Sequence, residues 1–68
     1  MTVTYDKGDS VDSSVCSIYN DTGELIYQGK WHKALEWARY EFNFAADRGL
    51  SDLANYYLEI IQALKRRA

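Results

Sequence analysis

The sequence predicts an α+β fold in which a β-hairpin precedes two antiparallel helices, in the order ββαα. Three observations predict it. Residues 15–28 hold two runs rich in β-branched and aromatic residues on either side of an Asx-Gly turn. Residues 30–48 and 51–67 repeat their apolar residues with the period of an amphipathic helix. The short joint between these two segments favours an antiparallel helical hairpin.

The segment before the hairpin, residues 1–14, is polar and acidic. Residues 2–5, Thr-Val-Thr-Tyr, have the composition of a strand, and the Asp-Lys-Gly-Asp at 6–9 is typical of a turn. Two interpretations stay open. The segment is either a third strand at the edge of the sheet or a flexible arm.

The hairpin itself is expected within residues 15–28. Residues 21–23, Asp-Thr-Gly, suit a three-residue loop that ends in a left-handed glycine. With that loop, Ile18 lies opposite Ile26. Because an isolated two-stranded hairpin is only marginally stable, we expect the helices to cover one of its faces.

Each helix carries an apolar stripe that is expected to face the core. In the first helix, residues 30–48, the stripe consists of Trp31, Ala34, Leu35, Ala38, Phe42, Ala45 and Ala46. Gly49 suits a left-handed C-terminal cap, and Ser51 is expected to cap the second helix, residues 51–67. The stripe of the second helix is wider and consists of Leu53, Tyr56, Tyr57, Ile60, Ile61, Ala63 and Leu64. Leu53 and Ile60 are expected at its centre.

A second, aromatic ridge on the first helix is the most informative functional feature. Trp37, Tyr40 and Phe44 lie roughly 120–180° around the helix from the core stripe, with Arg48 beside them. Either the hairpin and the second helix cover this ridge within the molecule, or the ridge faces a partner. Trp, Tyr and Arg are enriched in binding hot spots. With Leu58, which lies outside the stripe of the second helix, the candidate protein-binding residues are Trp37, Tyr40, Phe44, Arg48 and Leu58.

Nucleic-acid binding is the alternative function, and the overall charge does not favour it. The net charge is −2 and the sequence pI is about 5.1. Residues 1–29 carry five acidic residues against one lysine, whereas residues 30–68 carry seven basic residues against five acidic ones. The residues that would serve this alternative are Lys30, Lys33, Arg39, Lys65, Arg66 and Arg67.

The sequence contains no catalytic or metal-binding pattern. Cys16 falls in an expected strand and His32 at the start of the first helix, and no motif supplies the third group that would orient them as nucleophile and base. One Cys and one His cannot form the usual four-ligand zinc site. We therefore expect a protein that is not an enzyme and that uses no metal or cofactor.

The length of 68 residues indicates a single domain, residues 1–68, of marginal stability. A partner subunit is one of the usual supports for so small a domain, so we expect a homodimer. No apolar run approaches the roughly 20 residues that span a bilayer, and no membrane association is expected. A lone thiol fits the reducing cytoplasm.

These observations favour a small protein-binding module that acts as an inhibitor or adaptor. In size and acidity the chain resembles the small acidic proteins of phages and mobile elements that inhibit host machinery by binding it, anti-CRISPR proteins among them. The resemblance covers size and composition and no motif. It implies a role in host takeover or anti-defence that is exerted on a protein partner.

Overall fold

The α+β fold is confirmed, and it includes the third, N-terminal strand. The computed structural model describes residues 1–5 and 15–67, so the turn expected at 6–9 lies outside the described residues. The elements are β1 (Thr2–Tyr5), β2 (Val15–Tyr19), β3 (Leu25–Lys30), α1 (Trp31–Asp47) and α2 (Ser51–Arg67). Both helices agree with the expected segments to within a residue at each end.

The three strands form one antiparallel sheet in the order β1-β2-β3. The central strand β2 is the most buried, with Cys16, Ser17 and Ile18 all inaccessible to solvent or nearly so. Val3 of β1 pairs with Ile18 and packs on the core, while Thr4 pairs with Ser17 on the other face. On that face the Gln28 Nε2 donates a hydrogen bond of 3.0 Å to the Ser17 Oγ. One face of the sheet therefore packs on the core, and the hydrogen-bonded Ser17 and Gln28 lie on the other.

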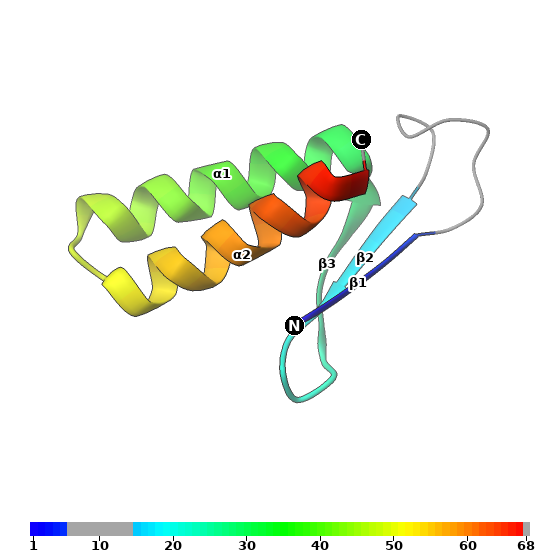
Figure 1. The fold of residues 1–68 in the computed structure, drawn as a ribbon, viewed down its shortest axis with the longest axis horizontal. Coiled ribbons are helices and arrows are strands. Elements are labelled where there is room, and N and C mark those ends of the chain that lie inside the picture. The colour runs from blue at the N-terminus through cyan, green and yellow to red at the C-terminus, as the bar shows by residue number, and fades with distance from the viewer. Residues whose placement is uncertain (6–14, 68) are drawn as a thin grey trace.

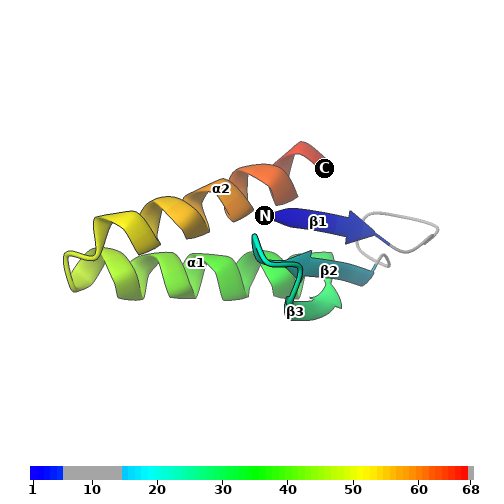
Figure 2. The same cartoon turned by 90° about the horizontal axis from the view of Figure 1, so that it is seen from below.

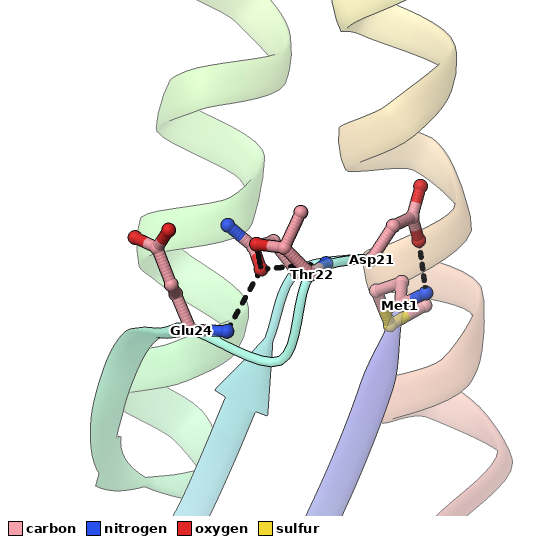
Figure 3. Close-up of polar contacts among 5 residues, drawn as sticks. Met1, Asp21, Thr22 and Glu24 are labelled. Atoms are coloured by element: carbon pink, nitrogen blue, oxygen red, sulfur yellow. Dashed lines mark hydrogen bonds and ion pairs between the residues drawn. The ribbon is translucent and has the colours of Figure 1, made fainter.

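The turn between β2 and β3 has the expected three-residue loop. Asn20 organises it: its Oδ1 accepts hydrogen bonds from the backbone N–H of Thr22 (3.0 Å) and of Glu24 (2.9 Å), and from the Thr22 hydroxyl at 2.8 Å (Figure 3). Gly23 closes the loop at φ 87°, a left-handed conformation that glycine adopts without steric cost. The Asp21 carboxylate pairs with the N-terminal ammonium group, which ties the start of β1 to this turn (Figure 3).

The expected register of the hairpin holds for Tyr19 opposite Leu25 and is wrong from Ile18 onward. Ile18 pairs with Tyr27 and not with Ile26, because the register shifts at the Ile18–Tyr19 step and leaves Ile26 as an extra residue on β3. The shift brings the Tyr27 ring to the core face. There it lies over Gly29, where an added Cβ would meet the phenol ring at 3.1–3.4 Å.

The joint between the helices is a Schellman motif. The Leu50 N–H donates to the Ala45 carbonyl at 2.9 Å, the Gly49 N–H donates to the Ala46 carbonyl at 3.1 Å, and Gly49 has φ 71°. The Leu50 carbonyl then accepts from the Ala54 N–H at 2.9 Å. Ser51 is thus the first helical residue of α2, and Leu50, not Ser51 as expected, stands at the capping position.

The helices form one layer and the sheet forms another, with the core between them (Figure 1). The core consists of Cys16, Ile18, Ala34, Ala38, Ile60, Ile61 and Leu64. The fully buried members from α1 are the alanines Ala34 and Ala38, and larger, partly buried side chains of α1 pack against the core: Trp31, Leu35, Trp37 and Phe42. The Trp31 Nε1 donates a 2.8 Å hydrogen bond to the Leu64 carbonyl, which fastens the start of α1 to the end of α2.

The sheet covers only part of the helix layer. It lies beside the half that holds the start of α1 and the end of α2, and the half that holds the Gly49 turn extends past it (Figure 1; Figure 2). We call this second half the distal half, residues 40–58. Two expected core residues are exposed here, Leu53 and Ala46. Their helical phase suits burial, but none of the three described strands covers this half (Figure 1), and Ala46 lines an open groove between the helices, so that expectation was wrong.

Candidate protein-interaction surface

The expected aromatic ridge on α1 divides into an internal and an external part. Trp37 is half-buried and packs on the core. Its ring stacks on Tyr27 of β3, with the centroids 4.6 Å apart and the planes at 16°, and meets the edge of Tyr57 of α2 at 5.6 Å. For Trp37 the internal interpretation therefore holds, because both the hairpin and the second helix cover it.

The rest of the ridge is exposed. Tyr40 is 68% and Phe44 42% accessible. Seven residues are close to two helical turns, so Phe44 lies on the same side of α1 as Trp37, about 10 Å nearer the Gly49 turn. That is past the end of the sheet. The Arg48 guanidinium lies over the Phe44 ring, 4.2 Å from its centroid, in a cation–π contact.

Two leucines of the helical hairpin extend this exposed surface. Leu53 is 39% accessible and precedes Tyr57 by one turn of α2, so it lies on the side of α2 that contacts Trp37. Leu50 is exposed in the joint itself. Together these residues form what we call the distal face, on the sheet side of the distal half. Its residues are Tyr40, Glu41, Phe44, Arg48, Leu50 and Leu53.

Glu41 gives the distal face a negative charge beside its aromatic rings. Burial raises the pKa of the Tyr57 phenol, and the charge of Glu41 and the neighbouring Tyr56 raise it further. Glu41 is partly accessible and follows Trp37, which meets the edge of Tyr57, by one turn of α1. Within residues 1–5 and 15–67, neither Glu41 nor Arg48 has an ion-pair partner.

A second apolar surface lies on the opposite side of the distal half. It is an open groove of about 290 Å³ between the helices, lined by Phe42, Ala46, Gly49, Ser51, Ala54, Asn55 and Leu58. Phe42 and Ala46 are each two residues from Phe44, or about 200° around α1. Leu58, which is 38% accessible, belongs to this groove. The expected site residues Phe44 and Leu58 are thus on different surfaces.

The basic residues of the alternative function lie mainly at the other end of the molecule. Lys30 and Lys33 stand at the start of α1, and Lys65 and Arg66 at the end of α2, where Trp31 and Leu64 join the two helices. Arg39 is exposed in the middle of α1, apart from them. Lys33 pairs with Glu36 at 3.7 Å. The Arg67 side chain lies outside the described part of the chain.

The chemistry-bearing residues show no built site. Cys16 is completely buried in the core, whereas His32 is exposed on α1. In the part of the chain that the structure describes, no three His, Cys, Asp or Glu residues come together in a way that could hold a metal ion. Neither α1 nor α2 is long and apolar enough to cross a membrane.

Comparison with protein-family models, with curated proteins and with solved structures gives no match to this chain. The assignment of the distal face as a candidate interaction surface therefore depends on its geometry alone.

Sequence reasoning found three residues of this face and missed three. It grouped Tyr40, Phe44 and Arg48 by helical phase, which was sufficient for residues on one helix. Leu53 was assigned to the core by the same phase, because a helical wheel does not show where the facing sheet ends. For Leu50, the available signal was that an apolar residue directly follows the capping Gly49. For Glu41, the sequence offered only its place beside the aromatic ridge.

Proposed function

We propose that this protein is a non-enzymatic protein-binding module that uses the distal half of its helical hairpin as the binding element. One observation carries the proposal. Five of the six large exposed apolar side chains in the described part of the chain fall within residues 40–58: Tyr40, Phe44, Leu50, Leu53 and Leu58. Scattered exposed apolar residues need no explanation, but their concentration on one projecting element is typical of an interaction surface.

The residue types support a binding role. Tyr40 and Arg48 belong to the classes that dominate hot spots, and the guanidinium of Arg48 is already held over Phe44. A side chain that is ordered before binding loses less conformational entropy on association. A two-helix projection presenting such residues suits an inhibitor or adaptor, which acts by occupying a partner's surface.

The biological setting that we propose follows from the same features and from the resemblance in size and acidity to small phage and mobile-element proteins. The partner would be a host protein, and the outcome would be inhibition in the manner of anti-defence proteins. Because the sequence contains a single cysteine, Cys16, the reducing cytoplasm is the compartment that we propose.

Site-specific photo-crosslinking tests this function. A photo-reactive phenylalanine analogue replaces Phe44 or Leu58 in the cellular host, and replaces Glu36, which is exposed on the proximal half, as a control. We expect defined crosslinked protein products from the positions of Phe44 or Leu58 and none from that of Glu36. Products of equal yield from all three positions, or from none, would overturn the proposal.

The nucleic-acid alternative is retained on one observation, the convergence of Lys30, Lys33, Lys65 and Arg66 at the proximal end of the helix pair. Retention on a polynucleotide column tests it. A phosphate-binding surface loses affinity steeply between 50 and 200 mM salt, on the order of 10³-fold for six phosphate contacts. An acidic protein with four clustered cations is expected to elute at low salt.

A further inference from the structure

We infer that the distal face is occupied by a second copy of this chain, which packs on it with the two α1 helices antiparallel about a two-fold axis between Phe44 and Ala45. The inference rests on the proposed function, and it names the partner of this one face.

Charge complementarity carries the inference. Glu41 and Arg48 are equally distant from the midpoint between Phe44 and Ala45, one on each side. Their seven-residue spacing puts them on nearly the same side of α1. In an antiparallel pair centred on that midpoint, Glu41 of each protomer lies opposite Arg48 of the other. Two cross-pairs then form from residues that have no ion-pair partner among those described in one protomer.

The apolar residues fit the same axis. Phe44 lies next to it, so the two Phe44 rings meet near the centre of the interface. Tyr40, Leu50 and Leu53, all exposed in one protomer, surround that centre. A two-fold interface must match itself, and a central aromatic pair within a ring of apolar and charged residues meets this requirement.

The shape of the chain favours the antiparallel direction. The sheet stands on the same side as the distal face but beside the proximal half only (Figure 1; Figure 2). A second chain in antiparallel orientation sets its own sheet beyond the Gly49 turn of the first. The distal half of each chain then fills the space beside the sheet of the other. A parallel arrangement would bring the two sheets to the same end and place like charges opposite each other.

The experiment uses charge reversal at the two cross-paired positions. Wild-type protein, Glu41→Arg and Arg48→Glu are each measured by light scattering after size exclusion and by sedimentation, with circular dichroism to verify folding. We expect a dimer for the wild type at micromolar concentration. Each single variant should dissociate at least about tenfold more readily, because it places like charges opposite each other twice.

Mixing the two variants gives the decisive result. A heterodimer of Glu41→Arg with Arg48→Glu has an Arg opposite a Glu at both cross-pairs, although each variant alone is repelled. Native mass spectrometry with one variant isotopically labelled should therefore show mostly heterodimer. A statistical mixture, no dimer from the mixture, or a wild type that stays monomeric to hundreds of micromolar would overturn the inference.

A matched pair of leucines separates this inference from the proposed function. Leu53 and Leu58 are equally exposed, at 39% and 38%, but lie on opposite surfaces of the distal half. We expect Leu53→Asp to abolish the dimer and Leu58→Asp to leave it intact. The reverse order overturns the two-fold arrangement yet leaves a protein-binding distal half. A monomeric wild type whose Phe44 position crosslinks only to another protein also overturns this inference and supports the proposed function.

Discussion

Trp37 and Phe44 show that two aromatic residues on one side of one helix can have different roles. Trp37 is enclosed by Tyr27 and Tyr57, whereas Phe44, two turns further along, is 42% accessible and has the Arg48 guanidinium over its ring. The difference is the length of the sheet, which ends between them. Fold and binding are therefore expected to separate when these residues are replaced.

We predict that Trp37→Ala lowers the free energy of unfolding by about 3 kcal/mol, because it empties space beside the core. Phe44→Ala should lower it by less, by about 1 kcal/mol, since Phe44 stays 42% accessible in one protomer and lies outside the core. Urea titrations at protein concentrations well below the dimer dissociation constant measure both values. Similar losses for the two variants would mean that the ridge is a single structural unit.

A second prediction concerns Tyr56, whose hydroxyl oxygen is buried and has no hydrogen-bond partner among the described residues. An unsatisfied buried hydroxyl costs about 1–3 kcal/mol of desolvation. Tyr56→Phe keeps the ring that meets Tyr57 edge to face and removes the hydroxyl. We expect stability to be unchanged or to rise by up to about 1 kcal/mol in thermal melts. A clear loss would show that the hydroxyl is hydrogen-bonded.

Alkaline pH should weaken the fold through the same two tyrosines. Burial, together with nearby negative groups, raises the pKa of Tyr56 and of Tyr57 above the ordinary value of 10.0. The folded state thus holds the phenolic protons more tightly than the unfolded state does. This contribution is complete below about pH 10 and is lost as the pH rises through the folded-state pKa.

Melting temperatures measured between pH 8 and pH 12 check this third prediction. Tyr57→Phe should reduce the alkaline loss, and Glu41→Gln should reduce it by a smaller amount, because it removes only one of the causes. The same pH dependence in the wild type and in Tyr57→Phe would contradict the assignment to Tyr57.

At the scale of elements, local signals in the sequence were sufficient for the two glycine turns but placed the cap of α2 one residue too late, at Ser51. Gly23 and Gly49 both take the left-handed conformation that their positions indicated. The strand register was not predictable, because a bulge costs little free energy in the local backbone. Its position depends instead on which side chains it places in the core. Here it brings Tyr27 under Trp37, a contact between β3 and α1 that no local rule contains.

A fourth prediction tests this arrangement. Gly29→Ala introduces a Cβ that would meet the Tyr27 ring at 3.1–3.4 Å, and the stacked Trp37 restricts the ring from moving aside. We expect a loss of about 1–3 kcal/mol, as for other overpacked positions. In a Tyr27→Leu background the same change should cost much less. A double-mutant cycle measures the coupling, and additive losses would show that the ring does not confine position 29.

At the scale of the whole molecule, the two layers differ in length. The helical hairpin has two 17-residue helices, and β3, the longest of the described strands, has six residues. Sequence reasoning gave the order of the hairpin and the two helices and left the N-terminal strand as one of two alternatives, but it treated every helical stripe as a core face. How far one layer extends past another is a property of the assembled fold, so the distal face could not be read from helical period alone.

The last prediction separates the part of each helix that stabilises one chain from the part that binds a second. Ile60 and Leu53 lie seven residues apart on the same side of α2, yet Ile60 is fully buried and Leu53 is 39% accessible. Ile60→Ala should lower the free energy of unfolding by about 2–5 kcal/mol at every protein concentration. Leu53→Ala should cost less than about 1 kcal/mol in dilute solution.

At protein concentrations far above the wild-type dissociation constant, the difference in stability between Leu53→Ala and the wild type should grow. The wild-type protein gains stability from dimerisation by mass action, and the variant gains less. Thermal melts of the three proteins over a hundredfold concentration range provide the measurement. If Leu53→Ala loses much stability at every protein concentration, Leu53 belongs to the core. The distal face would then contain no residue of α2.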